Sequence, residues 1–280
     1  MFESRGRQRT SEQGEDAVVI GDTLEDWEAA EKNELPFVWA AYGYGKGLEQ
    51  APFRAENVME MEAHLSRLRV FYELYHYFKG KRIIGISGVD ASGKTEFTDA
   101  YSRFLVEIGV ENQIVHIDDF HNPVRVRQQG SNPVEAYYRN AFDYDRLIQE
   151  ILRPLSHGEA FVKTLFCLDL GTDQYNKKVD FCFKEDTVAL LEGVLLFRQP
   201  LLNFLDGTVF LDIPFDEMLR RAEKRDTVVW GADVRKRYLE KYIPIQKKYL
   251  KECYPKENCD VLIDNRNYNA PVIMRTKKRP

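Results

Sequence analysis

Residues 82–95 read Arg-Ile-Ile-Gly-Ile-Ser-Gly-Val-Asp-Ala-Ser-Gly-Lys-Thr, an apolar run that passes directly into a glycine-rich turn. The turn, at residues 88–95, fits the pattern G-x-x-x-x-G-K-[ST] of a phosphate-binding loop. Its context supports this interpretation, because a buried strand precedes it and an amphipathic helix with Phe97, Tyr101 and Phe104 follows it. The alternative is a plain strand-to-helix turn with a lysine in solvent, which these flanking elements disfavour.

The residues of this turn have distinct expected roles. Gly88 and Gly93 let the backbone wrap, so that N–H groups of the turn and of the helix start face an anion. We expect Lys94 to reach the outer phosphates of ATP and the Thr95 hydroxyl to ligate Mg²⁺. The expected nucleotide-binding residues are Gly88, Val89, Asp90, Ala91, Ser92, Gly93, Lys94 and Thr95.

The composition is typical of a globular protein with a full-sized core, since 44% of the 280 residues are hydrophobic and 30% are charged. A formal net charge of −5 argues against general binding to nucleic acid or to a membrane surface. No apolar run approaches the ~18 residues that span a bilayer, and residues 1–7 lack the apolar core of a signal peptide. Cys167, Cys182, Cys253 and Cys259 form no C-x-x-C pair. We therefore expect a cytoplasmic protein with reduced thiols and with no nucleic-acid or membrane partner.

Strand and helix signals alternate after Lys81, which predicts an α/β fold with a parallel sheet and helices on both faces. The expected strands are residues 82–87, 113–117, 187–191, 209–213 and 261–263. The expected helices are residues 94–108, 144–152, 215–224 and 232–252. Residues 161–168 and 178–183 flank Gly171-Thr172-Asp173 and therefore predict an inserted β-hairpin.

The first part of the chain, residues 1–55, is expected to form a small strand-helix-strand appendage. Its strands are predicted at residues 17–20 and 36–42 and its helix at residues 24–32, and residues 47–56 are expected to be a linker.

The main domain is expected over residues 56–270, beginning with a helix at 56–78. Met61, Leu68 and Phe71 share one apolar face of that helix, which is more typical of core packing than of a binding site. Residues 271–280 are expected to form a basic, loosely held tail.

Carboxylates follow two of the predicted core strands, at Asp118-Asp119 and at Glu192. Ligands of open α/β sheets bind beyond the carboxyl ends of the strands. A kinase needs a carboxylate there to orient an acceptor hydroxyl and take its proton, and we expect Asp118 to be this base. Glu192 is expected to be the acid associated with Mg²⁺. Two alternatives stay open: one member of the acidic pair caps the next segment, and Glu192 is an ordinary strand-ending glutamate.

A basic helix includes Arg220, Arg221, Lys224 and Arg225. A basic segment that closes over the nucleotide would neutralise charge on the transferred phosphoryl group. Arg225 is the first candidate because it lies at the predicted helix end, where a lid would begin. The alternative is a solvated cationic helix face.

Together these segments resemble the uridine kinase and phosphoribulokinase family of P-loop kinases. The resemblance rests on residues 88–95, 118–121, 141–143, 191–194, 221–226 and 259–265. It implies ATP- and Mg²⁺-dependent phosphorylation of a primary hydroxyl of a nucleoside or a sugar phosphate. It further implies that Asp118 is the catalytic base and that Glu192 is the metal-associated acid. Lys94 would then bind phosphate, Thr95 would ligate the metal, and Arg225 would be an arginine of the lid.

The acceptor side of the resemblance rests on Asp118, His121, Asp143 and Phe166. Nucleoside kinases of this family read the base with a tyrosine on the hairpin and a nearby histidine. In this chain Phe166 stands near the tyrosine position and no histidine follows. Stacking is retained but polar pairing is not, so the sequence does not specify uridine as the acceptor. Asp143 is expected either to hold sugar hydroxyls or only to start a helix.

The N-terminal segment is similar to the closing part of a haloacid-dehalogenase-type phosphatase, through residues 18–26, Ala29-Ala30 and residues 42–45. In that family two acids, here Asp22 and Asp26, hold Mg²⁺. The nucleophilic Asp-x-Asp has no counterpart here and no lysine precedes Gly21, so we expect a partial and inactive segment.

The function expected from the sequence is ATP-dependent phosphoryl transfer to a small-molecule hydroxyl. The sequence leaves open whether the protein forms a homo-oligomer. The alternative is a catalytically silent, nucleotide-binding regulatory protein. A GTPase or motor is disfavoured because no N-K-x-D motif is present.

Overall fold

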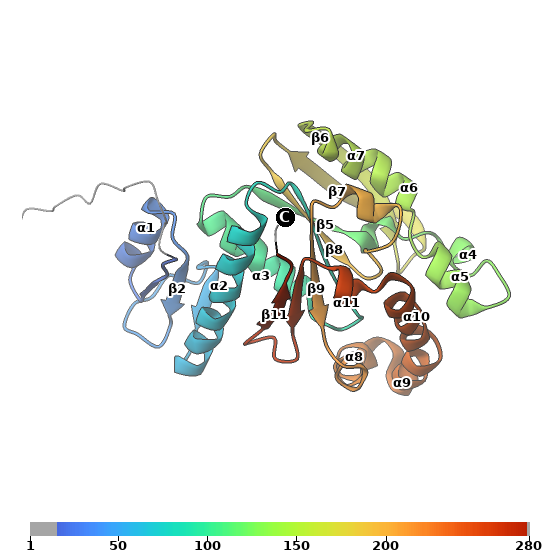
Figure 1. Ribbon diagram of the computed structural model, residues 1–280. Helices are drawn as coiled ribbons and strands as arrows, with labels where there is room; N and C mark the ends of the chain where they lie inside the picture. Colours follow the sequence, from blue (N-terminus) through green and yellow to red (C-terminus); the bar gives the residue numbers. More distant parts are fainter. Residues whose placement is uncertain (1–15, 279–280) are drawn as a thin grey trace, which may run out of the picture.

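The structure is a computed structural model, and it describes residues 16–278 (Figure 1). The expectation about residues 1–7 lies outside this range, as do the first residues of the predicted appendage and the last two of the predicted tail. Within residues 16–278, none of the helices combines the length and the apolar character that crossing a membrane requires.

A central sheet runs in the order β11-β10-β9-β4-β8-β5, with all neighbours parallel except β10 and β11. Its strands are β4 (Ile83–Gly88), β5 (Asn112–His116), β8 (Val188–Gly193), β9 (Gly207–Asp212), β10 (Val261–Asp264) and β11 (Val272–Thr276). Strand β4 is buried along its whole length, as expected of a parallel strand covered on both faces. The predicted α/β fold is therefore confirmed.

Each face of the sheet carries its own apolar core. Because successive side chains of a strand point to opposite faces, Ile83 packs in one core and Ile84 and Ile86 pack in the other. Helices α2 (Val58–Phe78) and α3 (Lys94–Glu107) cover the second face, and Figure 1 shows them side by side.

The remaining helices lie mainly around the first face and the carboxyl ends of the strands. They are α4 (Val124–Arg127), α5 (Pro133–Asn140), α6 (Tyr144–Leu147), α7 (Arg153–Ser156), α8 (Phe215–Trp230), α9 (Val234–Arg237), α10 (Ile243–Cys253) and α11 (Pro255–Asn258). A π-helical segment joins α6 to α7, and another, η5 (Tyr238–Tyr242), joins α9 to α10. The predicted hairpin is β6 (Phe161–Asp169) and β7 (Gln174–Phe183), paired antiparallel.

Helix α8 is longer than its sequence pattern indicated. It continues past Lys224 to Trp230, so Arg225 lies inside the helix and not at its end. The charged run of residues 223–226 hides the continuation, because it lacks the apolar spacing that marks an amphipathic helix.

The N-terminal appendage consists of β1 (Val19–Gly21), α1 (Leu24–Lys32), β2 (Phe37–Ala40) and β3 (Phe53–Ala55). Its strands form a small parallel sheet in the order β1-β2-β3. The expected linker at residues 47–56 is therefore wrong, because it contains β3. Val38 and Phe53 share a core with α2 and α3, and the Tyr72 hydroxyl donates a hydrogen bond to the Ala17 carbonyl at 2.6 Å. The appendage is packed against the main domain.

The expected loose tail is also wrong for residues 272–276, which form the edge strand β11. Ile273 packs against the core that α2 and α3 cover, while Val272 and Met274 are exposed. This alternation is the pattern of an edge strand with one buried face. The backbone N–H of Lys277 then donates to the Asp260 carbonyl at 2.8 Å.

Candidate active site

The phosphate-binding loop joins β4 to α3 and is tightly wrapped. Gly93 has φ +84°, a left-handed conformation that glycine adopts without strain. At Gly88 an added Cβ would lie 2.5 Å from the Ser92 hydroxyl and 2.6 Å from the Leu211 carbonyl oxygen, so only glycine fits. The Lys94 ammonium donates to the Val89 carbonyl at 2.9 Å and thus folds back across the loop.

The outer side of this loop is held by a neighbouring strand end. The Asn265 side-chain amide, just beyond β10, donates to the Ser92 carbonyl at 2.7 Å. Both residues are buried, so this hydrogen bond is shielded from water.

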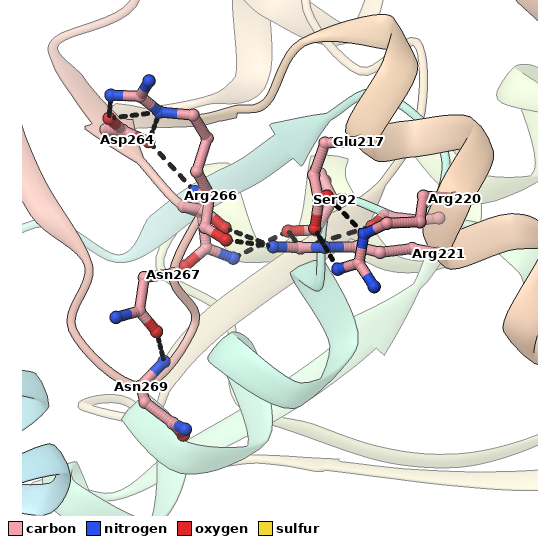
Figure 2. Close-up of polar contacts among 10 residues, drawn as sticks. Ser92, Glu217, Arg220, Arg221, Asp264, Arg266, Asn267 and Asn269 are labelled. Atoms are coloured by element: carbon pink, nitrogen blue, oxygen red, sulfur yellow. Dashed lines mark hydrogen bonds and ion pairs between the residues drawn. The ribbon is translucent and has the colours of Figure 1, made fainter.

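Arg221 of α8 ties the same two segments together (Figure 2). Its guanidinium donates to the carbonyl oxygens of Asn265 and Arg266 at 2.8 and 2.7 Å, and it approaches that of Ser92 at 3.4 Å. An ion pair with Glu217 at 2.6 Å fixes its orientation. Arg221 is therefore engaged in supporting the loop and is not a free lid cation.

Buried charges meet at the inner side of the loop. Burial lowers the pKa of Lys94, and the carboxylates of Asp90, Glu192 and Asp118 act in the opposite direction. Burial raises the pKa of Asp90, and the positive charge of Lys94 opposes this shift. The Asp118 carboxylate acts electrostatically on both groups, and it follows β5 at the same edge of the sheet as the loop. The catalytic roles of Lys94 and Asp118 stay predictions.

Glu192, at the end of β8, is nearly buried and faces the loop. Its carboxylate lies 3.5 Å from the Thr95 hydroxyl and 2.7 Å from Nδ1 of His116. The hydrogen bond that the His116 ring donates to the Glu192 carboxylate raises the pKa of His116. His116 ends β5, the strand next to β8, and was not among the site residues expected from the sequence.

The donors of Thr95 and Glu192 fit Mg²⁺. Hydroxyl and carboxylate oxygens are hard ligands, and Mg²⁺ is commonly held by one or two carboxylates together with substrate phosphates and water. Within residues 16–278 no cluster of three or more His, Cys, Asp or Glu side chains is arranged to hold a metal by itself. A cation here would therefore depend on the nucleotide phosphates for its remaining ligands.

The two acids after β5 have different environments. Both lie on the 3₁₀ helix η1 (Ile117–Phe120), where the Asp118 side chain is 64% exposed and that of Asp119 is 3% exposed. Asp119 pairs with Lys177 of β7 and raises the pKa of that lysine. Asp119 therefore anchors the hairpin, and Asp118 is the member of the pair that is available to a ligand.

His121 lies behind Asp118 and is buried. Its Nδ1 is 3.7 Å from the Asp118 carboxylate and 3.1 Å from the Asp118 carbonyl, and its Nε2 is 3.3 Å from the Tyr137 hydroxyl. Burial lowers the pKa of His121, so the neutral ring is favoured. This burial supports a positioning role for His121 more than the expected contact with an acceptor.

Asp143 and Phe166 differ in what they offer to a ligand. Asp143 accepts a hydrogen bond from the Arg146 N–H at 3.0 Å and caps α6, which is the helix-starting alternative. Phe166 is 57% exposed on the hairpin, and its carbonyl accepts from the Arg146 guanidinium at 2.9 Å. That guanidinium also lies 5.5 Å from the ring centroid of Tyr175 on β7. The hairpin thus carries a half-exposed tyrosine that the sequence analysis missed.

Arg225 is held by two neighbours inside α8 and η5. It pairs with Asp226 at 2.6 Å and donates to the Tyr238 hydroxyl at 3.1 Å. Its hydrogen bond to Asp226 raises the Arg225 pKa. Its positive charge acts on Asp90 and Lys94, so it lies within electrostatic reach of the loop.

Comparison with known proteins identifies relatives of this chain. Residues 83–267 match the family described as Phosphoribulokinase / Uridine kinase. The chain belongs to the phosphoribulokinase and uridine kinase family. The uridine kinase of Aliivibrio salmonicida is 27% identical over 196 residues, which cover 68% of this chain and 89% of that protein. The uridine kinase of Aeromonas hydrophila is 28% identical over 210 residues, covering 70% of this chain and 92% of that protein.

Solved structures of this kinase family share the fold. A structure described as that of a possible uridine kinase from Bacillus stearothermophilus superposes with a TM-score of 0.58 at 23% identity. The matched region covers 72% of this chain and 99% of the Bacillus stearothermophilus chain. Membership in the family indicates a small-molecule kinase that uses ATP, typically with a divalent metal ion.

Proposed function

We propose that this protein transfers the γ-phosphoryl group of ATP to a hydroxyl of a small molecule of the nucleoside or sugar type. One observation carries the proposal: Lys94 at the start of α3 and the exposed Asp118 just after β5 lie at the same edge of one parallel sheet, beside the phosphate-binding loop. A nucleotide bound on the loop would present its outer phosphate between these two groups. An alcohol next to Asp118 would then stand in line for phosphoryl transfer.

The roles of the chain's residues follow from their contacts. The backbone of residues 88–93 binds the phosphates, and Lys94 exchanges its bond to the Val89 carbonyl for a phosphate oxygen. Thr95 and Glu192 would hold Mg²⁺, which supplies charge neutralisation on the phosphates. Arg225 stays close enough to stabilise negative charge on the transferring group.

Asp118 acts as the base in this proposal. Its carboxylate accepts the proton of the acceptor hydroxyl while the new P–O bond forms and ADP leaves. His121 and its hydrogen bond to Tyr137 support the backbone and the side chain of Asp118 from behind. His121 is therefore proposed to orient the base without contacting the acceptor.

We also propose that residues 16–55 are a haloacid-dehalogenase-like remnant without phosphatase activity, appended to a kinase domain at residues 56–270. The contacts of its two acids support this proposal. Asp22 accepts the N–H groups of Tyr44 and Gly45 at 2.7 and 3.1 Å. Asp26 accepts the Thr23 N–H and hydroxyl in a capping box. Both carboxylates thus stabilise local turns.

We propose a cytoplasmic location for the protein, because the proposed reaction consumes ATP and the four cysteines are free thiols.

The test is an acceptor screen with the full chain, Mg²⁺ and ATP, in which products are read by mass. A gain of one phosphoryl group on a nucleoside or sugar compound, lost in Asp118→Asn while ATP still binds, is the expected result. Full turnover by Asp118→Asn would refute the assigned base. ATP binding without turnover of any acceptor would favour the silent regulatory protein.

A further inference from the structure

Positively charged side chains gather close to the segment that carries Asp118 and His121. They come from separate segments: Arg127 from α4, Arg237 from α9 and Lys241 from η5. The Lys241 ammonium lies 4.5 Å from the ring centroid of Tyr137 on α5 and 5.4 Å from that of Tyr242. Figure 1 shows α4 and α5 together on the same side of the molecule as α10, which continues from η5.

A short chain of contacts connects Lys241 with the proposed base. The Asp118 carboxylate is 3.7 Å from His121 Nδ1, and His121 Nε2 is 3.3 Å from the Tyr137 hydroxyl. The ring of that tyrosine carries the Lys241 ammonium on its face. Lys241 is therefore separated from Asp118 by two side chains only, those of His121 and Tyr137.

Lys241 has no anionic partner among the residues that the structure describes. Burial lowers its pKa first, and the positive charges of Arg127 and Arg237 lower it further. Among residues 16–278 no carboxylate forms an ion pair with Lys241, and its recorded contacts are the faces of two tyrosine rings. A half-buried ammonium beside two guanidinium groups is electrostatically unfavourable unless an anion joins them.

Arg127 is only partly neutralised. Its side chain is 16% exposed, and the nearest carboxylate oxygen, from Asp173, is 3.7 Å away. Its Nε is buried and has no hydrogen-bond partner in the described part of the chain. By contrast, the Lys177 ammonium on β7 is already paired with buried Asp119. The unsatisfied donors are therefore those of Arg127 and Lys241.

We propose that the acceptor carries an anionic group, which Arg127 and Lys241 bind while the acceptor hydroxyl faces Asp118. This inference rests on the proposed kinase function and narrows its substrate class. Guanidinium and ammonium groups suit phosphate or carboxylate oxygens. A neutral nucleoside would leave Lys241 without an anion and Arg127 with only the Asp173 carboxylate at 3.7 Å, and the exposed Phe166 on the hairpin offers it no polar side chain.

The test compares matched acceptors on the full chain with Mg²⁺ and ATP. The pairs are glycerol and glycerol 3-phosphate, glycerol and glycerate, and uridine and uridine 3′-monophosphate, in each of which the anionic member keeps a free primary hydroxyl. We expect the anionic member of at least one pair to have a kcat/KM roughly 10–100-fold above that of its neutral partner, as one or two charge-assisted hydrogen bonds provide. The two glycerol pairs separate phosphate from carboxylate as the recognised anion.

Variants then assign the effect to the cluster. Lys241→Met should raise KM for the anionic acceptor by roughly 10-fold or more and change kcat much less, because it removes one charged contact. Lys247→Met is the matched control, since Lys247 also lies over an aromatic ring, at 5.6 Å from that of Phe215 on α8, but away from Tyr137. Inorganic phosphate should inhibit the wild-type enzyme competitively with the acceptor, which tests the site without any substitution.

Each outcome decides between the two proposals. Preference for the neutral members with turnover intact would overturn the anionic acceptor and leave the kinase function standing. Absence of turnover with every acceptor would contradict both the kinase function and the anionic acceptor. A rise of KM for ATP in Lys241→Met, with KM for the acceptor unchanged, would assign these cations to the nucleotide. If Lys241→Met does not fold, Arg127→Gln and the phosphate inhibition carry the same decision.

Discussion

His116 Nδ1 lies 2.7 Å from Glu192 Oε1, so a hydrogen bond links the ends of neighbouring strands β5 and β8 at the edge where the phosphate-binding loop begins. Glu192 is 5% exposed, whereas the His116 side chain is 37% exposed. The bond holds the carboxylate toward the Thr95 hydroxyl at 3.5 Å. We infer that His116 is a positioning residue for the pair proposed to hold Mg²⁺.

The first prediction concerns this pair. His116→Phe should raise the Mg²⁺ concentration needed for half-maximal activity by roughly 10–100-fold, because a residue that orients a metal ligand typically contributes that much to metal affinity. The measurement is a Mg²⁺ titration of turnover at saturating ATP.

His157→Phe is the matched control for this substitution. His157 is 64% exposed and pairs with Glu159 away from the loop, so its replacement should leave the titration unchanged. Reduced activity of His116→Phe with an unshifted Mg²⁺ curve would contradict the positioning role.

The second prediction concerns the support of the loop by Arg221. Arg221→Lys should weaken ATP binding by roughly 10-fold or more, because a lysine cannot donate in several directions to the carbonyl groups of Ser92, Asn265 and Arg266. Calorimetric titration with ATP measures the dissociation constant. Arg220→Lys, next along α8 and exposed, is the control that should bind ATP like the wild type.

The phosphate-binding loop, the parallel sheet and the acids beyond β5 and β8 could be predicted because each depends on a few consecutive residues. The support of the loop could not. Arg221 and Ser92 are 129 positions apart, and the charged spacing of residues 220–226 is equally typical of a solvated helix. Because of the same spacing, the end of α8 could not be predicted, and Arg225 was wrongly expected at the end of the helix.

The short edge strands were missed for a different reason. The strand β3 has three residues and β11 has five, so neither shows enough alternation to stand out from a linker or a basic tail. Tyr175 was overlooked because the hairpin register, and hence which side chain lies next to Arg146, follows from pairing that no local pattern specifies.

The third prediction concerns pH and Glu217. Hydrogen bonds from Arg220, and then from Arg221, lower the pKa of Glu217 from 4.5 to about 2. A carboxylate whose folded-state pKa is lowered stabilises the fold above its unfolded-state pKa and loses that contribution as the pH falls through the folded-state value. The difference in the free energy of unfolding between the wild type and Glu217→Gln should therefore be constant above pH 4.5 and shrink between pH 4.5 and about 2.

Urea denaturation of the two proteins at pH 7, 4.5 and 3.5 measures this difference. Glu257→Gln is a suitable control, because Glu257 lies on α11 and forms no ion pair in the described part of the chain. A difference that stays constant down to pH 3.5 would mean that Glu217 does not hold its charge through these arginines.

The last prediction concerns the appendage. Phe53 of β3 is 4% exposed and lies in the same apolar core as Phe71 of α2 and Phe104 of α3. Phe53→Ala should therefore destabilise the whole chain by about 3–5 kcal/mol, the usual cost of removing a buried phenylalanine side chain. Trp27→Ala is the comparison, because Trp27 only flanks the smaller cluster of the appendage.

Thermal unfolding of Phe53→Ala, followed in the presence and absence of ATP, separates two cases. If Phe53→Ala shifts the same single transition that ATP stabilises, the appendage and the kinase domain unfold as one unit. If it lowers only a separate transition that ATP does not move, residues 16–55 fold on their own and the packing against α2 and α3 contributes little stability.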